Sequence, residues 1–321
     1  MKYYVYGDYS KNPCEGFQVI SSYLYNGLSE TRESTLIDSK SNFIITFLQF
    51  IKIKKGTIIF SNGPGYGTFL LTLFLNIFRK EVKIIWIMIR PTINSINQFL
   101  INKINVNLIF SSRKTNLVNK LLKNKNSAYI QNLRTVDFNK FKYSEDLKIQ
   151  ENMILHVGHI RPNRSLELLI DLKNRLGNQY KIKIVASSRF HFDKTLYEKL
   201  LNNNIDVDLN YYENLSHIYR QAICYIFPLK KKDRGAVDLP LSIVESLACK
   251  TPVISTDFGD VKNMFNTQDG VFIIDEKEDF IESSIKIINS GIKNGFPKIE
   301  DLDKKFNLNF LFEDIIKNNE K

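Results

Sequence analysis

Two arginines stand close together in residues 158–164, which read GHIRPNR. This loop follows an apolar run typical of a buried strand and precedes a helical pattern. The planar guanidinium group donates two parallel hydrogen bonds to phosphate, and a helix N-terminus adds free N–H groups. The sequence therefore predicts that Arg161 and Arg164 bind a diphosphate, with Gly158 allowing close approach of the backbone. A solvated basic turn is the alternative.

A carboxylate lies one turn into a second helical pattern, which begins near Pro240. From this position Glu245 could bind the hydroxyl pair of a ribose. The alternative is structural: Ser242 caps the helix, and Glu245, three residues later, completes a capping box. Asp238 precedes the helix and could either bind sugar hydroxyls or form the turn.

Short β-branched runs alternate with helical patterns along the whole chain. They predict strands over residues 2–6, 34–38, 57–61, 82–89, 106–111, 128–131, 153–157, 181–186, 207–209, 224–227, 252–255 and 271–274. In the first half, helices are predicted near 16–28, 42–52, 67–79, 93–103 and 113–123. This order predicts an α/β protein with two doubly wound parallel sheets. Ligands of such sheets bind at the carboxyl ends of the strands, where both arginines lie.

The stretch 132–152 is polar and lacks periodicity, so it marks a domain boundary. We expect a first domain over 1–135, a linker over 136–151, a second domain over 152–300 and a C-terminal helix over 301–321. That helix is amphipathic and could cross back onto the first domain. A length of 321 residues suits two domains rather than one core.

The first domain offers carboxylates but no histidine for acid–base chemistry, since all four histidines lie beyond residue 150. Asp8, Glu15 and Asp38 could serve as general base if the reaction needs one. For Asp8, shaping the loop after the first strand is the favoured role. Gly65 belongs to a glycine-rich loop whose spacing differs from the dinucleotide pattern. A tight turn explains that loop better, although it too faces the predicted cleft.

Composition excludes several classes of protein. With 43% hydrophobic and 25% charged residues, the chain is not disordered as a whole. Its cysteines, Cys14, Cys224 and Cys249, fit neither a disulfide framework nor a zinc ribbon and favour a reducing compartment. We expect a cytoplasmic protein because no N-terminal signal is visible and no apolar run is long enough to span a bilayer.

The net charge of +11 is unevenly distributed. Residues 1–150 contain 21 Lys and Arg against 9 Asp and Glu, a net charge of +12, whereas residues 151–321 have a net charge of −1. This asymmetry indicates an anionic partner for the first half: a lipid surface, a diphosphate-linked acceptor or nucleic acid. Solubility alone is the alternative.

Two segments of the second half resemble the group-one glycosyltransferases of the retaining, family-four type. The first family pattern is a strand, Gly-Arg and then Pro-x-Lys/Arg-Gly; Gly158, Pro162 and Arg164 match it, while His159 and Ser165 depart from it. The second pattern is a Glu-rich loop and then Glu-Ala-Met-Ala-Cys-Gly-x-Pro-Val-Ile. The residues that match it are Glu245, Ala248, Cys249, Pro252, Val253 and Ile254. The resemblance covers about residues 130–275, including a linker signature at Val136, Asp137 and Phe141.

This resemblance implies the GT-B fold, in which two Rossmann-like domains face a cleft. Residues 1–135 would form the acceptor side and residues 152–300 the nucleotide-sugar side. The implied activity is transfer of a hexose from a nucleoside diphosphate sugar to an acceptor hydroxyl, with retention, in the synthesis of cell-surface glycans or lipid-linked oligosaccharides. Neither a metal nor another cofactor is expected. An alternative acceptor is DNA, docked on the basic half.

The resemblance also implies roles for individual residues. Glu245 would bind the donor ribose, and Arg164 and Arg161 would stabilise the diphosphate leaving group. The family usually has a second glutamate where this chain has Val237, so the neighbouring Asp238 could replace it. Without that glutamate, a non-catalytic nucleotide-sugar-binding protein is a further alternative. The donor site would also include Gly158, His159, Leu241 and Ser242, and the acceptor side Asp8, Glu15 and Gly65.

Two apolar helical patterns in the first half end in basic residues. The stretch Thr68–Phe78 precedes Arg79 and Lys80, and Phe43–Phe50 precedes Lys52, Lys54 and Lys55. Such helices could lie on an anionic membrane surface, which would make the protein peripheral on the inner face of a membrane. Ordinary helices buried against the first sheet are the equal alternative.

Overall fold

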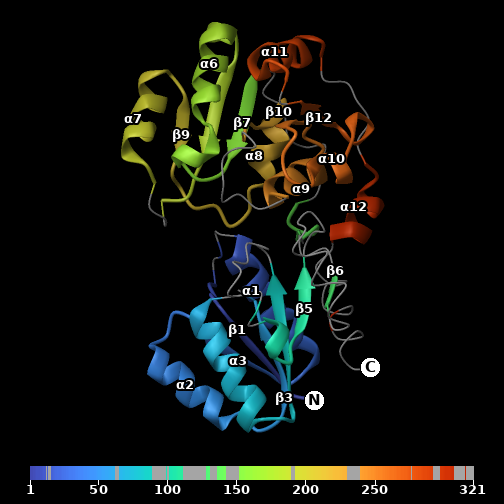
Figure 1. Ribbon diagram of the computed structural model, residues 1–321. Coiled ribbons are helices and arrows are strands. Elements are labelled where there is room, and N and C mark those ends of the chain that lie inside the picture. The colour runs from blue at the N-terminus through green and yellow to red at the C-terminus, as the bar shows by residue number, and fades with distance from the viewer. Residues whose placement is uncertain are drawn as a thin grey trace. The chain divides into compact units, whose positions relative to one another are not determined.

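The computed structural model describes residues 1–11, 13, 16–61, 65–88, 99, 101–110, 128–130, 136–141, 152–188, 192–229, 239–275, 277–291, 297–306 and 315 (Figure 1). The chain divides into two compact units. Unit 1 comprises Met1–Thr135 with Leu308–Lys321, and unit 2 comprises Val136–Asn307. Each unit is built on its own parallel sheet.

Unit 1 contains a six-stranded sheet in the order β2-β1-β3-β4-β5-β6, with all neighbours parallel. Its strands are β1 (Tyr3–Gly7), β2 (Ser34–Asp38), β3 (Gly56–Phe60), β4 (Val82–Met88), β5 (Asn107–Phe110) and β6 (Ala128–Ile130). Every residue of β3 is buried, as expected for a strand covered on both faces. The strand order reverses between β1 and β3, so the crevice of this sheet lies at their carboxyl ends.

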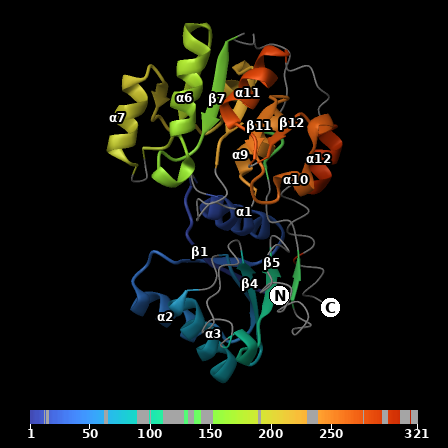
Figure 2. The same ribbon diagram turned by 45° about the horizontal axis from the view of Figure 1, so that its top comes forward.

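Three helices of unit 1 are described: α1 (Gly16–Thr31), α2 (Phe43–Lys52) and α3 (Tyr66–Phe78). The Asn42 side chain caps α2 by accepting a hydrogen bond from the backbone N–H of Ile44. Both α2 and α3 pack on the same face of the sheet, where Phe50 and Leu75 join a core built around Trp86. They run side by side in both views (Figures 1 and 2).

Unit 2 contains a second parallel sheet in the order β12-β11-β10-β7-β8-β9. Its strands are β7 (Met153–Val157), β8 (Lys181–Val185), β9 (Asp206–Asp208), β10 (Cys224–Phe227), β11 (Val253–Thr256) and β12 (Val271–Ile274). Two apolar cores contain buried residues from these strands. This is the strand order of a Rossmann sheet. Successive strands are added on one side from β7 and on the other side from β10, so the switch point lies between these two strands.

The α-helices of unit 2 surround this sheet (Figure 1). They are α6 (Glu167–Leu176), α7 (Lys194–Asn202), α8 (Ser216–Gln221), α9 (Leu241–Ala248), α10 (Val261–Met264), α11 (Phe280–Asn289) and α12 (Ile299–Phe306). Three short 3₁₀ helices accompany them: η1 (Pro162–Arg164), η2 (Gly177–Gln179) and η3 (Thr267–Asp269). None of the described helices has both the length and the apolar content needed to cross a bilayer.

The predicted fold class, two doubly wound parallel sheets, is confirmed. Each predicted strand is present with bounds that differ by at most one residue, because the buried strands are short continuous apolar runs. The helices predicted near 93–103 and 113–123 fall mostly outside the described residues.

The predicted linker begins with residues that pack into unit 2. Val136 lies in the same core as Leu302 and Phe306 of α12, and its backbone N–H donates to the Phe306 carbonyl over 2.9 Å. The residues from 307 onward lie outside the described part of the chain, apart from Ile315. The crossing of the C-terminal segment back to the first domain stays a prediction.

Candidate active site

The candidate site of unit 2 lies where the strand order reverses. From β7 the chain proceeds to β8 and β9 on one side, and β10, β11 and β12 lie on the other. The loop after β7 carries Arg161 and Arg164, and α9, which carries Glu245, follows β10. The crevice outside the carboxyl ends of β7 and β10 is the usual ligand site of such a sheet. The arginine loop and α9 therefore both follow strands at the switch point of this sheet.

Backbone hydrogen bonds fix the conformation of the arginine loop, residues 158–164. Ile160 is fully buried in a core of unit 2, and its carbonyl accepts a hydrogen bond from the Asp193 N–H over 2.9 Å. The Arg164 N–H donates to the Arg161 carbonyl over 3.0 Å and closes a turn. Ser165 then adopts a left-handed conformation, with φ of 52°, at the position where the family pattern has glycine. Both arginine side chains are half-buried.

Two neutral histidines accompany the arginines. Burial lowers the pKa of His156 to about 4, and burial together with the charges of Arg161 and Arg164 lowers the pKa of His159 to about 4. The His156 Nδ1–H donates to the Ile226 carbonyl over 2.8 Å. A Cβ atom on Gly158 would lie 2.9 Å from His156 Nε2, so the glycine makes room for this imidazole. At neutral pH the positive charge of the loop therefore comes from the two arginines.

The Glu245 carboxyl is half-buried and hydrogen-bonded within unit 2. The Tyr219 hydroxyl donates to its Oε2 atom over 2.9 Å. Burial raises the pKa of Glu245 to about 7, although the hydrogen bond from Tyr219 acts in the opposite direction. This carboxyl therefore changes charge near neutral pH, which is characteristic of functional sites.

The predicted cap of α9 is wrong. The helix begins at Leu241, and the N-cap position is occupied by Pro240, which has no side chain that can accept a hydrogen bond. Ser242 lies inside the helix, and its Oγ atom lies 2.7 Å from the Tyr225 hydroxyl. Glu245 therefore comes too late for the third helical position, and the capping box is excluded. The first N–H groups of α9 have no partner within the helix.

The buried residue Tyr225 interacts with several of the candidate site residues. Besides its hydrogen bond to Ser242, Tyr225 is influenced by two charges: burial raises the pKa of Tyr225, Glu245 raises it further, and Arg164 lowers it. The charges of Arg164 and Glu245 therefore both act on the phenol group that contacts Ser242. Sequence reasoning missed Tyr219 and Tyr225. The available signal was a polar-tipped residue inside an apolar strand, since a buried tyrosine hydroxyl usually needs a partner.

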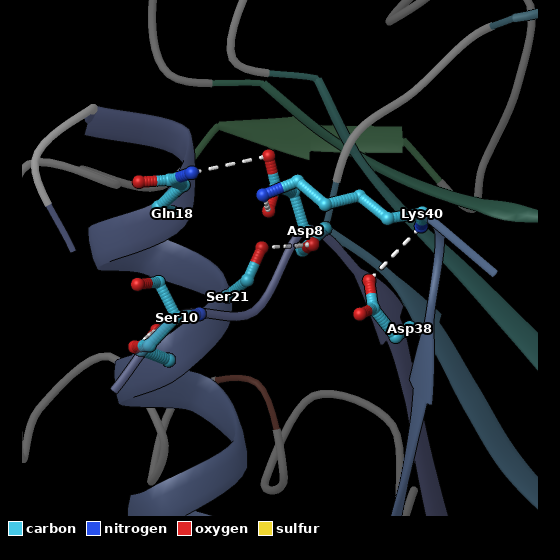
Figure 3. Close-up of polar contacts among 8 residues, drawn as sticks. Asp8, Ser10, Gln18, Ser21, Asp38 and Lys40 are labelled. Carbon is cyan, nitrogen blue, oxygen red and sulfur yellow. Dashed lines mark hydrogen bonds and ion pairs between the residues drawn. The ribbon is translucent and has the colours of Figure 1, made fainter. Parts of the chain in front are cut away.

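The polar residues after β1 form a second cluster, in unit 1 (Figure 3). Asp8 is 9% exposed; its Oδ1 atom lies 2.6 Å from Lys40 Nζ, and its Oδ2 atom accepts a hydrogen bond from Gln18 Nε2 over 3.2 Å. The Lys40 N–H in turn donates to Asp38 Oδ1 over 2.9 Å. These contacts tie the β1 and β2 ends together, in keeping with the structural role favoured for Asp8.

Two glycines of unit 1, Gly7 and Gly65, differ in how closely other residues surround them. The Oγ atoms of Ser21 and Ser61 lie 2.6 Å apart, and a Cβ atom on Gly7 would collide with both hydroxyls. Gly65, by contrast, is the N-cap of α3 with ordinary dihedral angles, and a Cβ atom there would meet nothing closer than 4.0 Å. Among the described residues, therefore, none crowds Gly65.

Two predicted site residues, Glu15 and Asp238, lie outside the described residues. Across the described part of the chain, no group of three His, Cys, Asp or Glu side chains is placed to hold a metal ion.

The two parallel α/β sheets are those of a GT-B glycosyltransferase, and comparison with known proteins supports this class. A family model described as "Glycosyl transferases group 1" matches residues 137–304, more than half of the chain. The chain belongs to this family and is a glycosyltransferase. No curated protein sequence matches it.

Solved structures with the same fold cover almost the whole chain. Anabaena Alr3699/HepE in complex with UDP has 12% sequence identity and a TM-score of 0.71, and the match covers 99% of both chains. Sucrose-phosphate synthase from Thermosynechococcus elongatus has 12% identity and a TM-score of 0.73, covering 99% of this chain and 98% of that one. The lipopolysaccharide outer core galactosyltransferase WaaB has 11% identity and a TM-score of 0.65, covering 99% of both chains. At such identities the likeness shows the fold alone.

Proposed function

We propose that the protein transfers a hexose from a nucleoside diphosphate sugar to an acceptor hydroxyl. The observation that carries this proposal is that the loop with Arg164 and the helix with Glu245 follow β7 and β10, the two strands at the switch point of unit 2, in a chain of the group-one family. UDP-sugars are the first donors to test, because Anabaena Alr3699/HepE has been crystallised with UDP and with UDP-glucose.

In this proposal the donor is held by complementary charges. The Glu245 carboxylate accepts hydrogen bonds from the ribose hydroxyls, and Tyr219 fixes its second oxygen. Arg161 and Arg164 donate to the diphosphate, because the guanidinium fork matches phosphate geometry. The first N–H groups of α9, at Leu241 and Ser242, add further donors for phosphate or sugar.

The reaction breaks the bond between the anomeric carbon and the diphosphate oxygen and forms a bond from that carbon to the acceptor oxygen. The acceptor proton passes to the leaving diphosphate on the same face of the sugar, which gives retention without a separate base. The arginines stabilise the developing negative charge, and one such donor typically contributes about 2.7–4 kcal/mol. This charge stabilisation is the role that a divalent metal would otherwise fill, so we propose that none takes part and expect activity to persist in EDTA.

The proposed setting is the synthesis of cell-surface glycans or lipid-linked oligosaccharides. One of the solved structures with this fold, WaaB, is described as a lipopolysaccharide outer core galactosyltransferase. The charge asymmetry of the chain supports an anionic partner for the first half, where the acceptor is expected.

A thermal-shift panel of UDP-glucose, UDP-galactose, UDP-N-acetylglucosamine and GDP-mannose tests the donor. Ligand at 100 times its Kd stabilises the folded state by about 2.7 kcal/mol, which is readily measured. We expect one UDP-sugar to raise the Tm and to be hydrolysed slowly without an acceptor. A flat response to every nucleoside diphosphate sugar would contradict the donor assignment, and binding without any hydrolysis or transfer would indicate a non-catalytic protein.

A further inference from the structure

Large apolar side chains are exposed mainly on one part of unit 1. Of the thirteen described residues of this kind, ten lie on α2 and α3, with exposed fractions between 37% and 75%. We call these ten residues the α2–α3 face: Phe43, Ile44, Ile45, Leu48 and Ile51 on α2, and Tyr66, Leu70, Leu73, Ile77 and Phe78 on α3. Single exposed apolar residues are normal, but a concentration of this kind marks an interaction surface.

The two helices form one continuous surface because they run side by side in both views (Figures 1 and 2). The Phe47 and Phe74 rings pack edge to face with centroids 5.1 Å apart. Near the carboxyl ends, Arg79 Nη2 donates to the Ile51 carbonyl over 2.9 Å. The opposite sides of both helices are buried in the core of the sheet. Each helix therefore has a buried apolar side, as expected for a helix packed on the first sheet, and also an exposed apolar side.

The charges beside the α2–α3 face have a single sign. Residues 43–80 contain no Asp or Glu. Their five basic residues, Lys52, Lys54, Lys55, Arg79 and Lys80, all follow or end the two helices, so parallel packing brings them to the same end of the face. Four of them are exposed and Arg79 is half-exposed. The first carboxylate after this segment is Glu81.

We propose that the α2–α3 face docks on the surface of an anionic lipid bilayer. The aliphatic and aromatic side chains enter the boundary between headgroups and acyl chains, while the basic end binds lipid phosphates. A second copy of the chain fits less well, because a symmetric contact would bring two surfaces without carboxylates together. A protein partner would meet few polar groups on these helices, whereas protein interfaces have a polar rim.

Flotation with vesicles tests this proposal without donor or acceptor, so its outcome is independent of the proposed function. The full chain is mixed with phosphatidylcholine vesicles containing a rising share of phosphatidylglycerol. We expect binding to increase with the phosphatidylglycerol content. Salt should release only part of the protein, because it screens the lysines but not the inserted apolar side chains.

Two variants separate the charge from the apolar contribution. Replacing Lys52, Lys54 and Lys80 by Gln should weaken binding about 100-fold, from about fivefold for each lysine near an anionic surface. The triple variant Ile44→Ser, Leu70→Ser, Ile77→Ser should keep its preference for anionic vesicles but be released completely by salt. A matched control, Leu201→Ser with Lys194→Gln and Lys199→Gln on α7 of unit 2, changes exposed residues of the same types and should bind like the parent.

A fluorescent variant reports insertion directly. Tyr66 is 75% exposed on α3, and the only natural tryptophan, Trp86, is fully buried. The Tyr66→Trp variant should therefore show a blue-shifted emission when anionic vesicles are added. Equal and negligible binding to neutral and anionic vesicles would overturn the proposal. So would concentration-dependent dimerisation that the apolar triple variant abolishes, or retention on duplex DNA without vesicle binding.

Discussion

The Glu245 carboxyl illustrates how burial prepares a single residue for ligand binding. Removing it from water raises its pKa to about 7, while the Tyr219 hydroxyl holds one oxygen in place. A carboxylate in this position has few competing waters, so polar ligand groups that reach it form strong hydrogen bonds. The sequence shows that Tyr219 and Tyr225 are polar-tipped residues in apolar surroundings, but it does not show which groups they contact. Tyr219 contacts Glu245 and Tyr225 contacts Ser242 only because α8, β10 and α9 pack together.

Replacing Glu245 by Gln or Ala should weaken donor binding while the fold remains intact. A hydrogen bond to a charged group contributes about 1.5–3 kcal/mol, so loss of one bond to a ribose hydroxyl predicts a Kd about 10- to 100-fold higher. Calorimetric titration with the UDP-sugar found in the panel measures this change. Tyr219→Phe, which keeps the carboxylate but removes its donor, should have a smaller effect. Parent-like affinity of Glu245→Ala would show that the ribose binds elsewhere.

Donor affinity should depend on pH through the same carboxyl group. With a pKa of about 7, Glu245 is largely protonated at pH 6 and largely ionised at pH 8, so the affinity should rise about tenfold over this range. The stability of the ligand-free protein depends on Glu245 in the opposite direction. Between pH 4.5 and 7 the Glu245 carboxyl binds more protons in the folded state than in the unfolded state. The contribution of Glu245 to the free energy of unfolding therefore falls as pH rises. His156 and His159, with pKa values of about 4, add stability as pH rises through 4 to 6.5. Comparison with Glu245→Gln isolates the glutamate, and identical pH profiles would refute its raised pKa.

Removal of Arg164 should reduce turnover more than stability. The side chain is half-buried and lies near His156, His159 and Tyr225, yet the backbone turn that it ends is formed by main-chain atoms. Loss of a donor to the leaving group typically lowers kcat about 100-fold or more. Arg164→Lys should recover part of this loss, because it keeps the charge but not the fork. Single-turnover kinetics at saturating donor decide the question, and unchanged turnover of the alanine variant would exclude the role.

At the scale of elements, the strands could be predicted and the cap of one helix could not. Strands such as β3 are buried on both faces, so their apolar runs are visible in the sequence. The helix α9 begins after Pro240, as the sequence predicts, but Ser242 is not its cap. Serine favours the N-cap position, whereas here Pro240, with φ of −65° and ψ of 136°, occupies it. Ser242 is used for a tertiary hydrogen bond to Tyr225 instead, and no local pattern reveals such a contact.

The carboxyl end of α9 carries a residue in a strained conformation. Lys250 has a φ of 54°, its N–H donates to the Leu247 carbonyl, and the Thr251 N–H donates to the Ser246 carbonyl, which together form a Schellman motif. Glycine is the usual residue at this position, and the family pattern has it there. Lys250→Gly should therefore raise the free energy of unfolding of unit 2 by about 1 kcal/mol. Urea denaturation measures the gain, and Lys250→Ala, which keeps the strain, should show none.

At the scale of the whole molecule, the two units are suited to different partners. Unit 2 carries the donor-site candidates, whereas residues 1–150 hold the net charge of +12 and the α2–α3 face. The charge asymmetry could be read from the sequence. The exposed face could not, because helices that are apolar almost all round look the same whether one side or every side is buried. Packing against the sheet decides which side chains remain exposed.

If both proposals hold, lipid docking should accelerate transfer only when the acceptor is in the membrane. Docking confines enzyme and acceptor to one surface, which raises their effective concentration without a new contact at the donor site. With an acceptor lipid in anionic vesicles, the variant lacking Lys52, Lys54 and Lys80 should show a higher apparent KM for acceptor, by about the 100-fold loss expected for vesicle binding. Its hydrolysis of the donor and its kcat on a soluble acceptor should match the parent, because these reactions need no membrane. The α7 variant provides the control. An equal loss on soluble and vesicle acceptors would place these lysines in the acceptor site itself, and parent-like kinetics on vesicles would separate lipid docking from catalysis.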